Sequence, residues 1–381
     1  MAKDESLKDV SVELADTLNK RFKTFDKVAY FLNEEDWSPS DITDWVSTGS
    51  SMLDLAIANR PNGGFPVGRI TEIAGLEASG KSLLAAHALK STQDKGGVAV
   101  YIDTENAISR EFFQAIGVKL EDMLYIPLDT VEDIFEAVEA IIEKIRSSNK
   151  NRLVTIVIDS IMGASTKPET AALYDKDGYA TSKALILSKA MRKITNYLGR
   201  ERICLIMTNQ LREKLGVSFG DKYTTSGGKA IGFHSSVRIR LKSIGQIKMK
   251  KGMVEQVIGI KTNATVIKNR MGPPLRSVEY DIYFDSGIDD YGSWLSIMKE
   301  QKMVSQAGAW YTFSTVDPET GEVEEVKFQS KDFFSKVLSN PDMKQEIYNQ
   351  ICDRLILKYK MNEDTGIDDV FIEEDFVNED E

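Results

Sequence analysis

The sequence predicts an α/β protein with a mostly parallel, twisted sheet, an N-terminal arm and a small C-terminal domain. Across residues 44–285, strand-like runs alternate with stretches of helical periodicity, as in sheets whose parallel strands are joined by helices. Three of the runs, 98–105, 153–160 and 203–210, are almost continuously apolar and end in polar residues. Such strands are buried on both faces, and their carboxyl ends meet at the edge where open α/β sheets bind ligands.

The stretch from Gly75 to Ser82 is the most specific motif in the chain. Gly75 and Gly80 have the spacing of a phosphate-binding loop, and Lys81 and Ser82 follow directly. The glycines let backbone N–H groups curl around phosphate oxygens, Lys81 can reach the β- and γ-phosphates, and Ser82 can bind Mg²⁺. We therefore predict a nucleoside triphosphate site. Its residues are Gly75, Leu76, Glu77, Ala78, Ser79, Gly80, Lys81, Ser82 and Leu83.

Composition indicates a globular protein, with 42% apolar and 28% charged residues. No apolar run approaches the ~20 residues of a membrane span, and the N-terminus lacks the apolar segment of a signal peptide. The chain has two cysteines and two histidines, too few for a disulfide framework or a metal cluster. We expect a reducing, cytoplasmic location and no membrane partner.

The net charge of −11 comes almost entirely from the last residues. Residues 362–381 contain ten carboxylates and no Lys or Arg, so the rest of the chain carries about −1. An acidic tail of this kind is usually disordered. It either aids solubility or competes with DNA for a basic surface, and the sequence leaves both interpretations open.

Polar residues at the strand ends suggest catalytic roles. Asp159 follows a mostly apolar run and suits a partner of Mg²⁺, directly or through water. Glu105 suits a general base that orients the attacking water, although a solvated carboxylate fits its position equally well. Gln210 lies where a strand is expected to give way to a loop, and it is a candidate sensor of the γ-phosphate.

Two polar loops are candidate DNA-binding segments. The loop at 163–182 is rich in lysine, and the loop at 212–229 combines cations, glycines, hydroxyls and an aromatic residue. These residue types can follow a phosphodiester backbone and wedge between bases. A mobile glycine-rich loop without a ligand is the plainer alternative. The cations and wedge residues of the second loop include Arg212, Lys214, Leu215 and Phe219.

Lys268 and Arg270 fall on one face of a predicted strand. Two cations on one face usually form a solvated surface. In an assembly driven by nucleotide they could instead reach the γ-phosphate held by a neighbouring subunit.

The two ends of the chain predict additional domains. Residues 1–43 contain an amphipathic helix over 7–23 and a strand-like run over 27–32, followed by a linker. This arm either packs on its own chain or adds a strand to a neighbouring subunit and so supports oligomerisation. Residues 286–361 have mixed periodicity and predict a small α+β domain.

Several of these motifs together resemble the bacterial RecA recombinase family in order and spacing. They are residues 46–50, 77–82, 101–105, 209–210, 224–228 and 307–311. The resemblance runs from about residue 10 to 360, and an inserted turn at 318–321 favours the phage-encoded, UvsX-type branch. It implies a RecA-type ATPase core that uses ATP and Mg²⁺. It also implies a homo-oligomeric helical filament on single-stranded DNA, strand exchange with double-stranded DNA, and single-strand-binding or mediator proteins as partners.

The resemblance also implies roles for individual residues. Glu105 matches the catalytic glutamate, Asp159 the Walker B acid and Gln210 the γ-phosphate sensor. Lys268 and Arg270 match a lysine pair that acts across the subunit interface. Phe112 matches an aromatic residue stacked on adenine, and Leu215 matches an apolar wedge between base triplets. The DNA-contacting positions are Arg192, Arg212, Ser226, Gly227 and Gly228.

Three positions depart from the family pattern. Ser109 replaces an aspartate that contacts adenine, so selectivity for the base is less certain. Leu185 replaces a DNA-contacting arginine, for which Lys183 offers a substitute. Ala180 replaces a methionine of the first loop.

Two other functions compete with the recombinase. A motor or regulatory ATPase with the same core, such as a ring helicase, does not explain the N-terminal strand or the loop at 212–229. An accessory DNA-binding protein with a vestigial ATP site conflicts with Lys81, Glu105 and Asp159.

Overall fold

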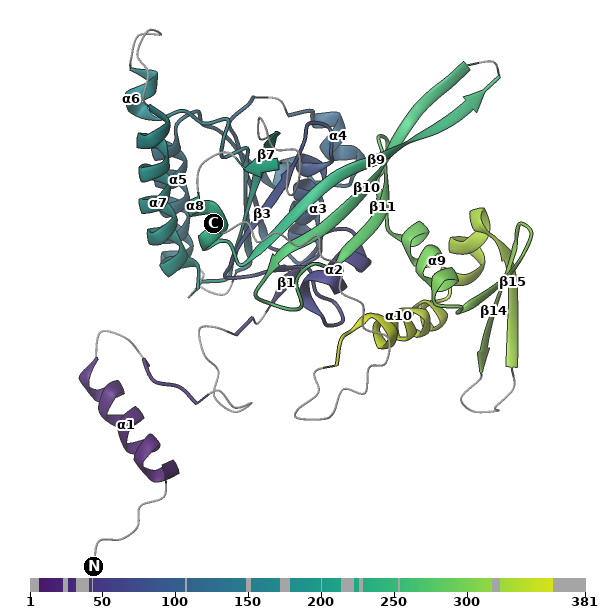
Figure 1. The fold of residues 1–381 in the computed structure, drawn as a ribbon, viewed down its shortest axis with the longest axis horizontal. Helices are drawn as coiled ribbons and strands as arrows, with labels where there is room; N and C mark the ends of the chain where they lie inside the picture. The colour runs from purple at the N-terminus through teal and green to yellow at the C-terminus, as the bar shows by residue number, and fades with distance from the viewer. Residues whose placement is uncertain are drawn as a thin grey trace, which may run out of the picture. The chain divides into compact units, whose positions relative to one another are not determined.

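The structure is a computed structural model, shown in Figure 1. It describes residues 7–22, 27–31, 41–42, 44–106, 108–148, 152–171, 179–199, 201–213, 223–225, 229–252, 254–316 and 323–358. The chain divides into two compact units, Met1–Thr43 and Asp44–Glu381.

The N-terminal unit contains helix α1 (Leu7–Arg21). Its apolar side chains repeat every four residues, as predicted, and they are exposed to solvent within this unit. These side chains are Val10, Leu14, Leu18 and Phe22.

The strand predicted over 27–32 is not formed in the part of this arm that the structure describes. Residues 27–31 are irregular and are held by Asn19, whose Oδ1 accepts hydrogen bonds from the N–H groups of Val28 (2.8 Å) and Ala29 (2.9 Å). A strand requires a hydrogen-bonded neighbouring strand, and one of the two predicted alternatives takes that neighbour from another subunit.

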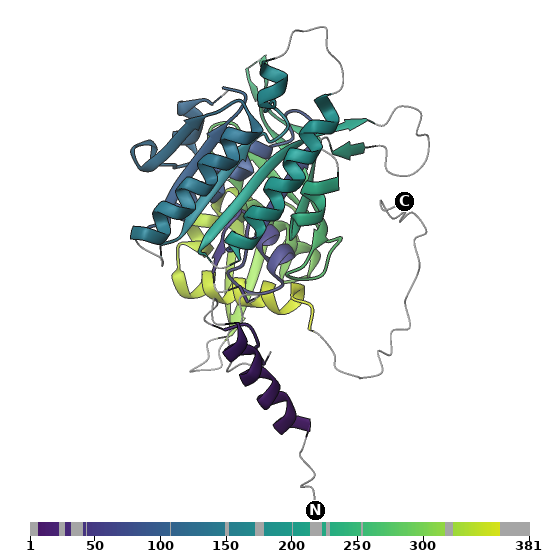
Figure 2. The same cartoon turned by 90° about the vertical axis from the view of Figure 1, so that its left-hand side faces the viewer.

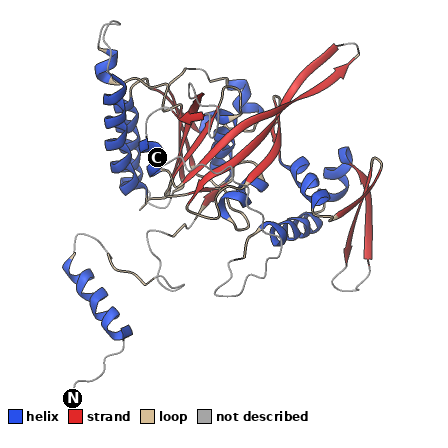
Figure 3. Ribbon diagram, viewed as in Figure 1, coloured by secondary structure: helices blue, strands red, loops and turns tan. Residues whose placement is uncertain are grey.

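The second unit is organised around a ten-stranded sheet of described strands (Figure 3). The central strands are parallel, in the order β9, β3, β7, β6, β4, β5. Their bounds are β3 Ile70–Gly75, β4 Val98–Asp103, β5 Met123–Pro127, β6 Val154–Asp159, β7 Ile203–Glu213 and β9 Val237–Lys251. The predicted α/β class with a mostly parallel sheet is confirmed.

An antiparallel extension continues the sheet beyond β9. It consists of β10 (Val254–Asn269), β11 (Ser277–Tyr283) and β12 (Gly287–Asp289), while β8 (Tyr223–Thr225) pairs with β7. Figure 1 shows β9 and β10 as a long hairpin. The predicted core ends at residue 285, but the sheet continues to Asp289.

Helices cover both faces of the sheet. On one face, α5 (Val131–Ser148) packs beside α7 (Tyr179–Leu198), as Figure 2 shows. Helix α3 (Lys81–Asp94) packs on the other face. Because side chains alternate along a strand, Val100 and Ile102 of β4 join the core under α5 and α7, whereas Tyr101 and Asp103 lie on the face of α3.

The remaining elements of this part are short. They are β1 (Trp45–Val46), α2 (Ser51–Ala58), β2 (Phe65–Pro66), α4 (Arg110–Ala115), a 3₁₀ turn (Leu120–Asp122), α6 (Lys167–Thr170) and α8 (Lys229–His234). Among the described helices, none combines the length and the apolar character needed to cross a membrane.

Residues after β12 form a small α+β domain. Its antiparallel sheet has the order β13, β14, β15, and helices flank it. The bounds are α9 Asp290–Glu300, β13 Val304–Ala307, β14 Trp310–Val316, β15 Val323–Gln329, a 3₁₀ turn Ser330–Asp332, a π-helix Phe334–Leu338 and α10 Pro341–Leu355.

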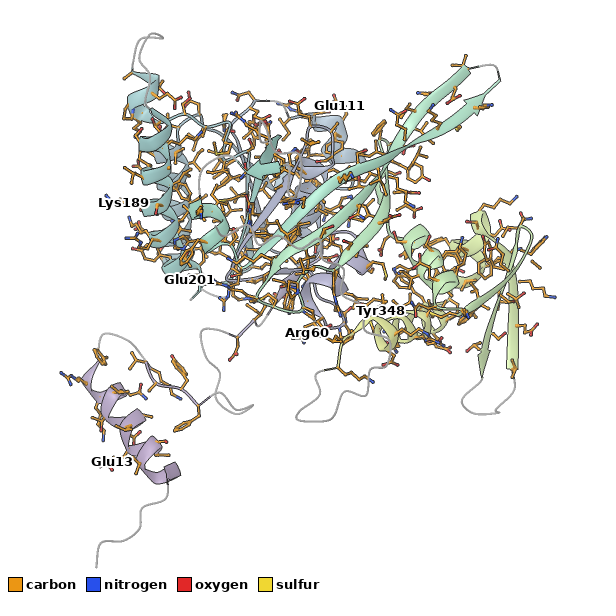
Figure 4. The ribbon with its side chains drawn as sticks, in the orientation of Figure 1. Glu13, Arg60, Glu111, Lys189, Glu201 and Tyr348 are labelled. Atoms are coloured by element: carbon orange, nitrogen blue, oxygen red, sulfur yellow. The ribbon has the colours of Figure 1, made fainter. Side chains whose placement is uncertain are left out.

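The small domain shares a hydrophobic core with the rest of the unit. Met52 and Leu55 of α2 pack in the same buried cluster as Trp294 of α9. Tyr348 of α10, labelled in Figure 4, accepts a hydrogen bond from the N–H of Asn62 (2.9 Å). These contacts hold α9 and α10 against α2.

Candidate nucleotide-binding site

The phosphate loop joins the end of β3 to the start of α3, as predicted. At Gly75, a β-carbon would lie 2.3 Å from the Ser79 hydroxyl and 2.9 Å from the Leu241 carbonyl, so no larger residue fits without a shift. Gly80 has φ +96°, a left-handed conformation that favours glycine. The Ser79 hydroxyl donates to the Leu76 carbonyl (2.8 Å). The loop therefore has the tight curvature that phosphate binding by backbone N–H groups requires.

The N-terminus of α3 faces this loop. Its N-cap residue is Gly80, which has no side chain to cap the first N–H groups of the helix. Such a helix end binds anions well. Ser82 is exposed here, but Leu83 is only 5% exposed and its side chain belongs to the core. Leu83 can therefore reach a nucleotide only through its backbone.

Lys81 is folded back over the loop. Its Nζ donates to the carbonyls of Leu76 (2.8 Å) and Gly75 (3.2 Å). Burial lowers the pKa of Lys81, while the nearby carboxylates of Asp159 and Glu105 act in the opposite direction. The lysine thus lies close to both predicted catalytic acids.

Asp159 is fixed at the end of β6, beside the end of β4. Asp103 and Asp159 are direct partners in the parallel register. The Tyr101 hydroxyl donates to Asp159 Oδ2 (2.5 Å), and the Thr208 hydroxyl donates to Asp159 Oδ1. Asp159 is only 8% exposed. Both of its oxygens are therefore held by hydroxyl donors on neighbouring strands.

Glu105 lies in the turn that follows β4. Oδ1 of Asp103 accepts hydrogen bonds from the N–H groups of Glu105 and Asn106, both at 2.9 Å, which shapes the turn. The Ser160 hydroxyl donates to Glu105 Oε1 (2.7 Å). The structure thus brings Glu105 close to Asp159, the last residue of β6, through Ser160, which follows it directly.

Four residues of this constellation were missed from sequence: Tyr101, Asp103, Ser160 and Thr208. Tyr101 and Asp103 alternate with buried apolar residues, so the pattern placed them on one face. The bond of Tyr101 to Asp159 and the pairing of Asp103 with β6 depend on strand order and register, which the pattern does not contain.

The donors at this edge fit Mg²⁺ bound with a triphosphate. Magnesium prefers oxygen ligands and keeps several waters, so it needs only one or two protein groups besides phosphate. The Ser82 hydroxyl and the anchored Asp159 carboxylate are such groups. Within the described residues, no group of three or more His, Cys, Asp or Glu side chains is arranged to hold a metal ion.

Gln210 lies within β7, which continues to Glu213, rather than at the strand end. It pairs with Gly75 in the parallel register, which places it beside the phosphate loop. Its neighbour Asn209 donates from Nδ2 to Glu72 Oε1 (2.7 Å), and the buried Glu72 also accepts from Arg238 Nε (2.6 Å). The strand that carries Gln210 is therefore tied to β3 and β9.

Phe112 lies on α4, the helix after the Glu105 turn. The Ser109 hydroxyl accepts a hydrogen bond from the Phe112 N–H (3.3 Å) and so caps this helix. The serine thus has a structural role at the position where the family pattern has an adenine-binding aspartate.

Lys268 and Arg270 lie at and just after the end of β10. Lys268 Nζ donates to the carbonyls of Gly232 (2.7 Å) and Phe233 (3.1 Å) at the end of α8. The pKa of His234 is lowered by burial and by three cations, Arg192, Lys268 and Arg270. The predicted interface cations and the predicted DNA contact Arg192 therefore share one positively charged surface.

The predicted DNA loops are described only in part. Lys183 lies on α7, and its Nζ donates to the carbonyls of Met162 (3.0 Å) and Ala164, so it anchors the first loop to the helix. Arg212 is exposed on β7. The other predicted contacts lie outside the described residues: Lys214, Leu215, Phe219, Ser226, Gly227 and Gly228.

Comparison with known proteins decides the family. The model of the RecA N-terminal domain matches residues 13–289. The chain belongs to the RecA family. It is 36% identical to Protein RecA of Leptospira meyeri over 309 residues, which cover 81% of this chain and 74% of that protein. It is 33% identical to Protein RecA of Geobacter metallireducens over 344 residues, or 90% of this chain and 94% of that protein.

Membership confirms the family that the motifs predicted and the RecA-type core. It identifies the protein as a recombinase of DNA recombination and repair, in a family of nucleotide-binding, DNA-dependent ATPases. Neither the match nor the similarity distinguishes the phage-encoded branch, which stays a prediction.

Proposed function

We propose that this RecA-family protein forms helical filaments on single-stranded DNA and couples ATP hydrolysis to homologous pairing and strand exchange. One observation carries the proposal. Lys81, Asp159 and Glu105 gather at the carboxyl edge of the sheet, next to β7, the strand that leads into the loop at 212–229. A nucleotide bound at this edge could therefore influence the candidate DNA-binding loop at 212–229 through β7.

Hydrolysis is assigned to the residues around the phosphate loop. Lys81 and the first N–H groups of α3 would bind the phosphates, and Ser82 and Asp159 would hold Mg²⁺, which neutralises phosphate charge. Glu105 would orient and deprotonate the attacking water. The Ser160 hydroxyl supports this role because it fixes one carboxylate oxygen of Glu105.

Coupling to DNA is assigned to Gln210 and its strand. Gln210 pairs with Gly75, the first residue of the phosphate loop, and β7 ends three residues later at Glu213. Loss of the γ-phosphate would change the contacts of Gln210 and so release the loop at 212–229 from DNA.

The ATP-binding site of one subunit would be completed by residues of the neighbouring subunit in the filament. Lys268 is partly buried, but Arg270 and Arg192 are exposed, and all three cations lie near His234, which suits an anionic γ-phosphate presented from outside the chain. The N-terminal arm, with its exposed apolar helix face, is the proposed link between subunits.

The test is ATP hydrolysis with no DNA, with single-stranded DNA and with duplex DNA at low salt. We expect strong stimulation by single strands, followed by strand exchange between homologous molecules. A ring helicase would instead unwind duplex DNA processively without exchanging strands. A rate of ATP hydrolysis that is the same with and without DNA would contradict coupling through β7. A cytoplasmic location and single-strand-binding or mediator partners remain part of the proposal.

A further inference from the structure

We propose that Tyr101 is a positioning residue that fixes the Asp159 carboxylate for magnesium-nucleotide binding and links it, through Phe113, to the base-binding helix α4. This inference rests on the proposed ATPase function. It adds a series of side-chain contacts through which α4, where Phe112 is expected to stack on the base, positions the Asp159 carboxylate.

The bond between Tyr101 and Asp159 is short and sheltered. The Tyr101 hydroxyl lies 2.5 Å from Asp159 Oδ2, and the two residues are 4% and 8% exposed. A hydrogen bond from a neutral hydroxyl to a carboxylate is about twice as strong as one between neutral groups. Burial, together with the negative charge of Asp159, raises the pKa of Tyr101 well above its usual range. The hydroxyl therefore keeps its proton and acts as the donor.

The Tyr101 ring is held from the other side by Phe113. Their ring centroids lie 5.1 Å apart at an angle of 85°, an edge-to-face contact that aromatic pairs prefer. Phe113 is 2% exposed, so it has little freedom to move away. Its ring in turn contacts Phe112 edge to face at 5.9 Å. Phe112 is the residue expected to stack on the base.

A continuous chain of contacts therefore runs from Phe112 through Phe113 and Tyr101 to Asp159. Thr208 on β7 holds the other oxygen of Asp159, two residues before Gln210. Loss of the Tyr101 hydroxyl would leave the carboxylate with one of these two donors and free to turn. The metal site would weaken while the phosphate loop stayed intact.

The test measures metal binding rather than turnover. A fluorescent ATP analogue is titrated into wild-type protein and Tyr101→Phe, once in EDTA and once at increasing Mg²⁺. We expect unchanged affinity in EDTA and a rise of about tenfold in the Mg²⁺ concentration for half-maximal tight binding, as is usual when a group behind a metal ligand is lost. Tyr280→Phe is the matched control, since Tyr280 is also buried and its hydroxyl makes no hydrogen bond within the described part of the chain.

The link through Phe113 is tested by a double-mutant cycle. Phe113→Leu should raise the Mg²⁺ requirement several-fold, and it should add nothing once the Tyr101 hydroxyl is gone. Additive effects would overturn the link to α4. Equal Mg²⁺ requirements for Tyr101→Phe, Tyr280→Phe and wild type would overturn the positioning role, whereas a wild-type protein that binds no nucleotide would overturn the proposed function itself.

Discussion

Ser160 donates a 2.7 Å hydrogen bond to Glu105, so the residue after the metal-site acid holds the proposed general base. The two proposed catalytic carboxylates therefore depend on consecutive residues: Asp159 carries one of them, and Ser160 binds the other, on Glu105. A small shift of β6 at this point would move both groups together. This relationship leads to the first two predictions.

Glu105→Gln should lower ATP hydrolysis by about 10²- to 10⁴-fold, because an amide cannot take a proton from water. ATP-dependent binding to single-stranded DNA should persist, because the phosphate loop is unchanged. Steady-state hydrolysis and fluorescence anisotropy with labelled DNA measure the two properties. Full turnover in this variant would rule out the base role.

Ser160→Ala should lower kcat by roughly tenfold, the value of one hydrogen bond to a charged group. The KM for ATP should change little, because Ser160 contacts Glu105 rather than the phosphate loop. The comparison with Glu105→Gln is informative. If Glu105 acts through this geometry, Ser160→Ala should have no additional effect in the Glu105→Gln background, and an additive loss would indicate a separate role for the serine.

Mixing two inactive variants tests whether Lys268 and Arg270 act on a neighbouring subunit. The double variant Lys268→Ala/Arg270→Ala keeps its own Glu105, and Glu105→Gln keeps its cations. In an equimolar mixture, roughly a quarter of the interfaces in a random head-to-tail polymer would combine both intact parts. Hydrolysis should therefore recover to about that fraction of wild type, whereas a mixture as inactive as its components would show that the cations act within their own chain.

Asp54 should make folding stability depend on pH. Burial raises the pKa of Asp54 to about 7, against the hydrogen bonds donated by Ser47 and Thr48. Between about pH 4 and pH 7, the folded protein therefore keeps a proton on Asp54 that the unfolded chain has lost. The free energy of unfolding falls as the pH rises through this range, and the contribution of Asp54 to stability is lowest above pH 7.

Asp54→Asn should consequently gain stability relative to wild type as the pH rises from about 4 to 8, by about 2–4 kcal/mol. Urea unfolding of both proteins at pH 5 and pH 8 measures the difference. Parallel pH dependence in the two proteins would show that the Asp54 carboxylate does not titrate in this range.

Removal of residues 362–381 should speed uptake of duplex DNA, because ten carboxylates no longer compete for the basic surface. The effect should shrink as salt is raised. A control protein that carries residues 362–381 in scrambled order keeps the charge of the tail and changes only its sequence. It should take up duplex DNA as slowly as wild type if charge alone is responsible. Unchanged uptake at low salt would leave solubility as the role of the tail.

The sequence predicted the phosphate loop and the strand ends because each is a local pattern. Glycine spacing located Gly75 and Gly80, and apolar runs ending in carboxylates located Asp159. The alternation around Lys268 predicted the end of β10, but the antiparallel pairing of β9 to β12 was not predicted, since pairing between distant segments leaves little trace in one sequence.

The detailed site was less predictable than the fold. The hydrogen bond of Tyr101 to Asp159 depends on β4 and β6 being neighbours in one register. Lys183 stays a predicted DNA contact, and its hydrogen bond to the carbonyl of Met162 was not predicted because it depends on how α7 packs. Composition suggests which groups are charged, while tertiary packing decides what they touch.

The shared core of α2, α9 and α10 sets a limit on shortening this protein. Met52 and Leu55 are almost completely buried, and Trp294, Ile347 and Ile351 cover them or each other in the same cluster. Arg276 Nη2 also donates to the carbonyl of Leu355 (3.1 Å). A fragment that ended at residue 285 would lack Trp294, Ile347 and Ile351, so Met52 and Leu55 would face water and would favour aggregation. The smallest piece that can fold as an ATPase therefore extends to the end of α10 at Leu355, 85 residues past Arg270, the last of the proposed catalytic residues.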